Sequence, residues 1–245
     1  MRLERISWVK AAEYFEHNDM VMLPLGSIES HGRHLPLGTD HLIPGRLVEL
    51  IEQQSDILVA PAMPYGCCDY LADFPGTISL GHEVLYSVLT QITQHLRQHG
   101  ARRFVILNGH GGNVSAIDRV ALDLRRQGCL LARLDWWLMA GQLNELWKGG
   151  HGGAEETAGV MAVDPALIDR EEIADITYTP LCDALPAAGI NLSAFEGLNI
   201  PIVRRSIEVS GNGWAGPDHP KLATRQMGEE MLAAMKGGQE WKLCF

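Results

Sequence analysis

Residues 29–40 concentrate four potential metal ligands in one short stretch: Glu29, His31, His34 and Asp40. The stretch follows the apolar run at residues 20–26, so it lies at the end of an expected strand. Glycine and proline between the four side chains exclude a single continuous helix, and we expect a loop. A loop can place carboxylate and imidazole groups around one point, as a divalent metal site requires.

Two later segments carry similar groups. His110 lies in Asn-Gly-His-Gly-Gly-Asn at 108–113, directly after another expected strand, and residues 151–157 are His-Gly-Gly-Ala-Glu-Glu-Thr. Open α/β sheets bind their ligands beyond the carboxyl ends of the strands. We therefore expect these segments to meet residues 29–40 at one edge of a sheet.

The expected ligand set combines imidazoles with carboxylates, which suits Zn²⁺, Mn²⁺ or Fe²⁺ better than Ca²⁺. Three or more carboxylates with two imidazoles can hold two cations, and an aspartate can bridge them because its two oxygens reach both. Cations paired about 3.5–4 Å apart can hold a bridging hydroxide and polarise a carbonyl group. A spare histidine could then protonate the departing nitrogen or oxygen.

The elements that must position these groups alternate between strand-like and helix-like patterns. A short connection joins each to the next, and this β-α-β-α-β order predicts a three-layer α/β/α fold with a mostly parallel central sheet. Residues 175–220 are richer in proline, glycine and asparagine, and we expect loops and short strands that cover an active site. No linker composition interrupts the chain, so residues 1–245 are expected to form a single domain. Strands are expected at 21–25, 57–60, 104–107 and 130–134, and helices at 41–54, 82–99, 113–127, 155–162 and 221–236.

Composition narrows the class of protein. Hydrophobic residues make up 46% of the 245 residues and charged residues 20%, which is ordinary for a soluble globular protein. The net charge of −10 argues against a nucleic-acid-binding surface. No apolar run approaches the roughly 20 residues that span a bilayer, and no signal peptide is evident, so we expect no membrane partner.

Five cysteines are scattered at positions that match no zinc-binding spacing, and their number is odd. A reducing cytoplasm is the simplest interpretation, with most of the five acting as buried filler. They are Cys67, Cys68, Cys129, Cys182 and Cys244.

Taken together, the motifs resemble the creatininase (creatinine amidohydrolase) family across nearly the whole chain. The most specific segment is 26–40, Gly-Ser-Ile-Glu-Ser-His-Gly-Arg-His-Leu-Pro-Leu-Gly-Thr-Asp. Phe-Pro-Gly-Thr at 74–77 and the two segments at 108–113 and 151–157 support it. Gly-Trp-Ala-Gly-Pro at 213–217 with Lys-Leu-Ala at 221–223 resembles the C-terminal segment of the family.

The resemblance implies two divalent cations, with Zn²⁺ favoured and Mn²⁺ or Fe²⁺ as alternatives. Glu29 and His31 would each bind one cation, Asp40 would bridge the pair, and His110 would be a further ligand. Glu156 would be the remaining carboxylate ligand, with Glu155 as the fallback. Both glutamates are also explained as ordinary acids in the first turn of a helix.

Other residues of the chain are candidates for catalysis, for orienting a ligand and for binding substrate. The resemblance implies that His151 is a catalytic acid or base beside the site and that His34 orients a ligand. Thr77 could shape the substrate pocket, although a plain turn explains it equally well. Trp136 and Trp137 could line the substrate cavity or serve as aromatic filler.

The chain departs from the family pattern at three positions. Gly112 stands where creatininase itself has a glutamate, so the missing carboxylate must come from elsewhere. Ala154 replaces an acid found in many members, and Leu71 replaces a histidine. These differences make creatinine an unfavoured substrate.

We therefore expect a dinuclear metal-dependent hydrolase that acts on a small cyclic amide, a formamide or a related C–N substrate. Two enzymatic alternatives stay open: hydrolysis of a C–C bond in a cyclic ketone of polyol catabolism, and a metal-dependent sugar isomerase. A non-catalytic binding protein is a third alternative. The expected partner is a small molecule, and the resemblance implies a homo-oligomer, often a hexamer.

Overall fold

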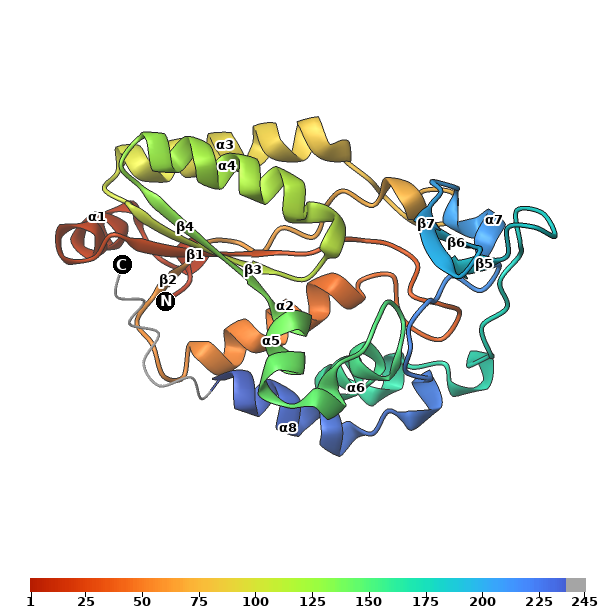
Figure 1. Ribbon diagram of the computed structural model, residues 1–245. Helices are drawn as coiled ribbons and strands as arrows, with labels where there is room; N and C mark the ends of the chain where they lie inside the picture. The colour runs from red at the N-terminus through yellow and green to blue at the C-terminus, as the bar shows by residue number, and fades with distance from the viewer. Residues whose placement is uncertain (237–245) are drawn as a thin grey trace.

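The computed structural model describes residues 1–236, and a four-stranded parallel sheet lies at its centre (Figure 1). The strand order is β2-β1-β3-β4. The central strand β1 is buried along its whole length, as expected for a parallel strand covered on both faces. The strands are β1 (Met20–Leu25), β2 (Leu58–Val59), β3 (Arg103–Asn108) and β4 (Leu130–Asp135).

Helices cover both faces of this sheet, which confirms the predicted three layers. α3 (Gly81–Gln98) and α4 (Val114–Arg126) cover one face, and α2 (Thr39–Ile51), α5 (Trp136–Leu143), α6 (Ala154–Val163) and α8 (Arg225–Lys236) lie on the other (Figure 1). Alternate side chains of β1 enter the two cores because successive residues of a strand point to opposite faces. Val21, Leu23 and Leu25 pack toward α3 and α4, while Met20 and Met22 pack toward α2.

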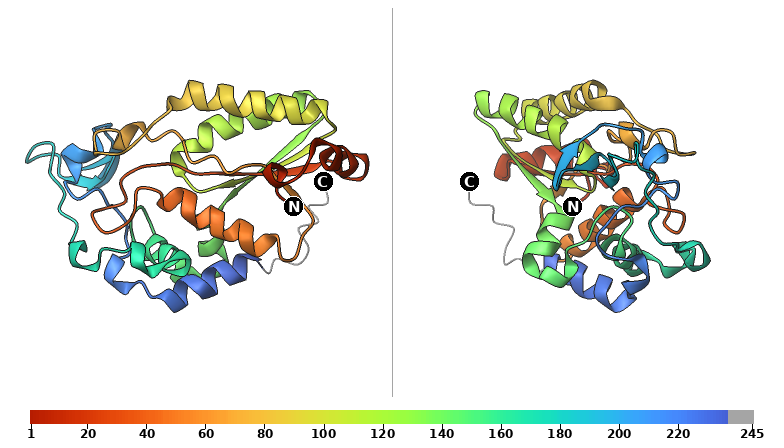
Figure 2. Two further views of the ribbon diagram at one scale, coloured as in Figure 1. Left: turned by 180° about the vertical axis from the view of Figure 1, so that it is seen from behind. Right: turned by 45° about the vertical axis from the view of Figure 1, so that its right-hand side comes forward.

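A small antiparallel sheet lies beyond the carboxyl edge of the main sheet (Figure 1; Figure 2 gives two further views). It consists of β5 (Ala187–Gly189), β6 (Leu192–Phe195) and β7 (Leu198–Pro201), followed by the short helix α7 (Ser206–Val209). The expectation of short strands within 175–220 is therefore confirmed.

Element boundaries differ from the sequence prediction at several points. The last helix begins at Arg225, not at residue 221, because Pro220–Leu222 form a 3₁₀ turn and the Thr224 hydroxyl caps the helix at Met227 N–H. The helix α1 (Trp8–His17) is absent from the predicted elements. The 3₁₀ turns are Leu3–Arg5, Asp69–Leu71, Gly111–Asn113, Glu145–Trp147, Pro165–Leu167, Arg170–Glu172 and Pro220–Leu222.

Four of the five cysteines lie in the described residues, where all four are free thiols. Cys67, Cys68 and Cys129 are buried free thiols, and Cys182 is exposed. Cys244 lies outside the described residues. Among residues 1–236, no helix combines the length and the apolar character needed to cross a membrane.

Candidate active site

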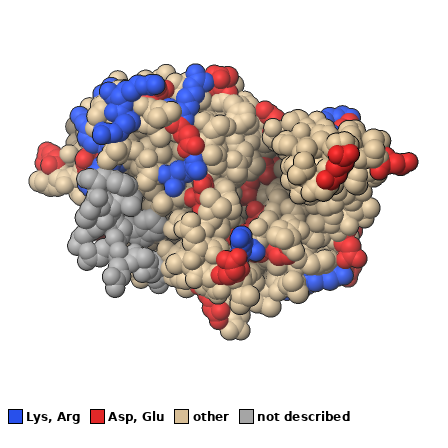
Figure 3. Space-filling model, in the orientation of Figure 1, with Lys and Arg blue, Asp and Glu red and all other residues tan. Residues whose placement is uncertain are grey.

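A cavity of about 480 Å³ lies at the carboxyl edge of the main sheet. It is lined by five of the side chains predicted as metal ligands or as the acid or base: Glu29, Asp40, His110, His151 and Glu156. Figure 3 shows acidic atoms in the hollow between the projecting part that carries the small sheet and the rest of the molecule. Segments far apart in the sequence thus meet at the expected edge.

Two glycines allow Asp40 to approach the ends of β1 and β3. A Cβ atom on Gly26 would lie 2.6 Å from the Asp40 carbonyl oxygen and 2.7 Å from the Cα of His41. A Cβ atom on Gly109 would overlap the same carbonyl oxygen and lie 2.8 Å from Pro44 Cγ. Any larger residue at these positions would push the first turn of α2 away from the sheet.

Asp40 lies between two imidazoles. Its Oδ1 atom is 2.9 Å from His31 Nε2, and its Oδ2 atom is 3.0 Å from His110 Nδ1. Each carboxylate oxygen therefore faces a different histidine, an arrangement compatible with a carboxylate that bridges two cations.

Two groups of three potential ligands share Asp40. One consists of Glu29, Asp40 and His110, and the other of His31, Asp40 and Glu156. In each group the candidate ligand atoms lie within 4.8 Å of one another. The carboxylate of Glu156 is 3.6 Å from His31 Nε2, and that of Glu29 is 3.1 Å from His110 Nε2.

Surrounding groups hold these side chains in place. The Ser27 hydroxyl donates to Glu29 Oε2 at 2.9 Å, and Gly152 N–H donates to Glu156 Oε2 at 2.6 Å. The His31 Nδ1 atom lies 3.1 Å from the Glu29 carbonyl oxygen, which leaves Nε2 to face Asp40. Such partners fix the orientation of a ligand before any cation binds.

The cluster carries more buried negative charge than its imidazoles can neutralise. Glu29, Asp40 and Glu156 are 0%, 2% and 8% exposed. Glu29 Oε1 is buried without a hydrogen-bond partner, and Asp40 Oδ2 is not aligned for a hydrogen bond to His110. Buried carboxylates of this kind need compensating positive charge, so the donor set fits divalent cations.

The same excess of buried negative charge shifts the pKa values of these groups. Burial opposes the charged form of His31, but the carboxylates of Asp40, Glu156 and Glu29 outweigh it and raise its pKa to about 10. Burial, with the Asp40 carboxylate adding, raises the pKa of Glu156 to about 7 against the opposing effect of His31.

His151 and His34 occupy different places. The ring of His151 lies 4.4 Å from that of His31, and its Nδ1 atom is 3.8 Å from Glu29 Oε1. Burial and the neighbouring His31 lower the pKa of His151 to about 4, so its imidazole is neutral. His34 does not line the cavity; its Nε2 atom lies 3.0 Å from the hydroxyl of Thr157, next to Glu156 on α6.

Of the three predicted substrate-binding residues, one lines the cavity and two do not. Trp137 lines the cavity, but Trp136, its neighbour on α5, points into the core and is 0% exposed. Trp136 packs beside Leu47, Ile51 and Leu107, and this corrects the expectation that it lines the substrate cavity. Thr77 does not line the cavity either, because its hydroxyl accepts the N–H of Ser30 at 3.3 Å and supports the loop of residues 27–38.

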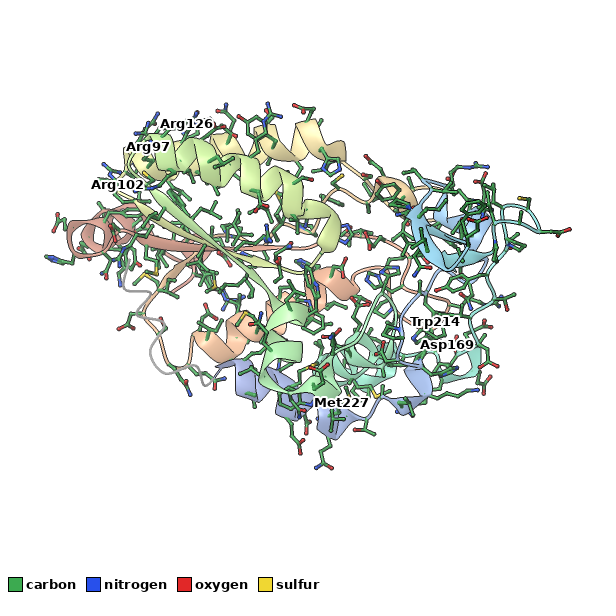
Figure 4. The ribbon with its side chains drawn as sticks, in the orientation of Figure 1. Arg97, Arg102, Arg126, Asp169, Trp214 and Met227 are labelled. Carbon is green, nitrogen blue, oxygen red and sulfur yellow. The ribbon has the colours of Figure 1, made fainter. Side chains whose placement is uncertain are left out.

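A segment near residue 218, not predicted from the sequence, holds α6 in place. Asp218 accepts the Glu155 N–H at 2.9 Å and so caps α6, whose own N-cap residue is Gly153. Nearby, Ala215 N–H donates to the carbonyl of His151 at 2.8 Å. Trp214, labelled in Figure 4, donates its indole N–H to Ala174. The motif at 213–217 pointed to this region, but no pattern linked residue 218 to a helix beginning at 154.

The fold and the cluster define an α/β protein with a carboxylate–imidazole centre at the edge of its sheet. The chain belongs to the creatininase family, because the family model described as "Creatininase: Creatinine amidohydrolase" matches residues 4–238. It is therefore a hydrolase of this family.

Relatives with assigned activities are similar over most of their length. A mycofactocin precursor peptide peptidase of Mycobacterium tuberculosis is 34% identical over 229 residues, which cover 88% of this chain and 80% of the relative. The creatinine amidohydrolase of Pseudomonas putida is 31% identical over 178 residues, covering 64% and 68%. A solved structure described as "Creatininase Mn" superposes with a TM-score of 0.75 at 27% identity, over 96% of this chain and 94% of that chain.

Proposed function

We propose that this chain is a metal-dependent amidohydrolase that cleaves a C–N bond in a small amide. The observation that carries the proposal is the pair of ligand groups that share Asp40. Glu29, Asp40 and His110 would hold one divalent cation, and His31, Asp40 and Glu156 the other. When bound, such a pair lowers the pKa of water and polarises a carbonyl oxygen.

The protein side chains contribute positioning and proton transfer. His151 lies at the cavity wall, beside Glu29, and its Nε2 atom has no hydrogen-bond partner. Its neutral imidazole can take a proton from the attacking water and pass it to the nitrogen that leaves when the amide bond breaks. Trp137 and Leu71 supply apolar surface that orients the substrate and excludes water from the cavity.

Creatinine is not the substrate that we propose. A side chain at position 112 would overlap the Cys67 carbonyl oxygen and the imidazole of His110, so the glutamate of creatininase does not fit in this backbone. Glu156 supplies the carboxylate in our assignment. Leu71 further changes the cavity, because it replaces a histidine of other members with apolar surface.

The first experiment is metal analysis by elemental mass spectrometry of the wild type and of Asp40→Ala. We expect about two equivalents of Zn, Mn or Fe in the wild type, the number that two ligand groups would hold, and a large loss in the variant. The matched control is Asp56→Ala, which removes an exposed aspartate and should retain the metal. Less than about half an equivalent in the wild type, even after metal is added, would contradict the ligand assignment.

A substrate panel then tests the reaction. Metal-loaded protein is incubated with cyclic amides, formamides and cyclic ketones, and products are followed by mass spectrometry. Hydrolysis of an amide adds the mass of one water and supports the proposal. Turnover of ketones alone would replace the amidase by a C–C hydrolase, and a product of unchanged mass would indicate an isomerase.

A further inference from the structure

Among the described residues, three that line the cavity, besides the metal-ligand groups and His151, carry polar atoms without hydrogen-bond partners. These atoms are Glu155 Oε1, Asn191 Oδ1 and Ser206 Oγ. Glu155 and Ser206 are only 2% and 1% exposed. Buried polar atoms are nearly always hydrogen-bonded, so three of them around one cavity indicate that a ligand completes their bonding.

The chemistry of the three atoms defines that ligand. A carboxylate and an amide oxygen accept hydrogen bonds, and a hydroxyl oxygen can also accept. Burial, with the nearby Glu156 and Asp218 carboxylates adding, raises the pKa of Glu155 to about 9, so its charged form needs a positive group beside it. Within the described part of the chain, no lysine or arginine lines the cavity. Figure 4 shows Arg97, Arg102 and Arg126 together at the opposite end of α3 and α4. The cavity therefore suits a group that donates hydrogen bonds, and it disfavours a carboxylate or phosphate.

Glu155 is fixed at the wall of this cavity. Its backbone N–H is bound by Asp218, and its side chain lies against the backbone of Gly149. A Cβ atom at position 149 would lie 2.9 Å from Glu155 Oε2 and would overlap Glu155 Cβ. The absence of a side chain at 149 thus leaves space for this carboxyl group between the backbone and the cavity.

Another part of the cavity wall comes from the part of the chain that carries the small sheet. Asn191 lies in the turn between β5 and β6, and Ser206 is the first residue of α7. Trp137, Leu138 and Ile190 add apolar surface to the cavity. A ligand in this cavity therefore meets cation ligands, apolar surface and a set of hydrogen-bond acceptors.

We infer that the substrate carries an amine or amidine group at the end remote from the bond that is cleaved, and that Glu155 binds this group. The inference rests on the proposed amidohydrolase function and specifies its substrate class. Asn191 and Ser206 accept further N–H bonds from the same end of the substrate. A charge-assisted bond to a buried carboxylate selects a cationic group over a neutral one of equal size.

The test compares three amides that differ only in the remote group: β-alaninamide, butyramide and succinamate. Binding of each to metal-loaded protein is measured by titration calorimetry, and hydrolysis by release of ammonia. We expect β-alaninamide to bind at least about tenfold more tightly than butyramide, which corresponds to about 1.4 kcal/mol, and succinamate to bind most weakly. Equal affinities, absence of binding or a preference for succinamate would overturn the inference.

Glu155→Gln removes the charge while keeping the size of the side chain, and Glu13→Gln removes an exposed acid on α1 as the control. The Glu155 variant should lose the preference for β-alaninamide through a higher Kd and KM, with kcat and metal content changed much less. The control should keep the preference. An unchanged preference in Glu155→Gln would refute the role of Glu155.

The same experiment distinguishes failure of the amidohydrolase proposal from failure of the inference that Glu155 binds a cationic group. Selective binding of β-alaninamide without hydrolysis of any amide would support the recognition group and contradict the amidohydrolase. Hydrolysis of butyramide or succinamate in preference to β-alaninamide would support the amidohydrolase and contradict the recognition group.

Discussion

Gly109 is needed for the space it leaves, not for an unusual backbone conformation. It is absent from the glycines with positive φ, yet a Cβ atom there would overlap the Asp40 carbonyl oxygen. Gly111 lies two residues later in the same loop, and a Cβ atom there would have no heavy atom of the described residues within 4 Å. The two glycines therefore have different requirements despite their shared motif.

We predict that Gly109→Ala displaces Asp40 and reduces bound metal, because the overlap forces the first turn of α2 away from the sheet. Overpacking of this kind costs about 1–3 kcal/mol of the free energy of unfolding. Urea unfolding and elemental analysis provide the measurements. Gly111→Ala is the control and should change neither the bound metal nor the free energy of unfolding. If Gly109→Ala also kept wild-type metal binding and stability, α2 would tolerate the added Cβ atom.

At the scale of single residues, the sequence predicts the cluster better than its surroundings. Glu29, His31 and Asp40 could be predicted because one strand end and one loop keep them together. Trp136 and Trp137 could not be separated, since neighbouring helical residues point in directions about 100° apart and the rotation of α5 is set by packing. Asp218 could not be assigned because its partner, the N–H of Glu155, is remote in sequence.

At the scale of elements, one tyrosine hydroxyl hydrogen-bonds α1 to the sheet. The Tyr14 hydroxyl donates to the carbonyl of Met20 in β1 at 2.7 Å and accepts the N–H of Leu58 in β2 at 3.1 Å. It therefore joins a helix to two adjacent strands. Burial raises the pKa of this phenol, so it stays protonated and able to donate at neutral pH.

We predict that Tyr14→Phe lowers the free energy of unfolding by about 1–3 kcal/mol, because it leaves a buried N–H and a buried carbonyl without partners. The measurement is chemical denaturation followed by circular dichroism. Tyr65→Phe removes a hydroxyl from a side chain that is 42% exposed and should change stability by less than about 0.5 kcal/mol. Equal effects of the two substitutions would argue that the Tyr14 hydroxyl is not what holds α1.

The helix α1 also shows why part of the fold could not be predicted from the sequence. α3 can be predicted from its long apolar stripe, which packs on the sheet through Leu85 and Leu89. In α1 only Tyr14 is fully buried, and the helix has 10 residues against the 18 of α3, so its apolar pattern is too short to stand out in the sequence. Long elements with a wide buried face can be predicted, whereas a short helix with a narrow buried face cannot.

At the scale of the whole molecule, the acidic balance of the chain adds to the charge within the site. The chain carries a net charge of −10, and the carboxylates of Glu29, Asp40 and Glu156 lie buried in one cluster. Bound cations would therefore contribute to the stability of the fold as well as to catalysis, since a ligand that binds only the folded state stabilises it.

We predict that a chelator lowers the melting temperature of the wild type by about 5–10 °C, given about 2.7 kcal/mol for a ligand present at 100 times its Kd and 2–4 °C per kcal/mol at this chain length. Differential scanning fluorimetry with and without EDTA measures the effect, and adding Zn²⁺ or Mn²⁺ back should reverse it. Asp40→Ala, which lacks the shared ligand, should respond little. A wild-type melting temperature that is insensitive to chelation would count against resident cations.

The bonds from Ala215 to His151 and from Asp218 to α6 have a consequence for the order in which the protein is assembled. A ribosome delivers Glu29, Asp40 and His110 together with the central strands, early in translation. Glu156 emerges later, and the segment that holds its helix emerges later still. The nascent chain thus presents all residues of one proposed ligand group before Glu156, which the other group needs, has been synthesised.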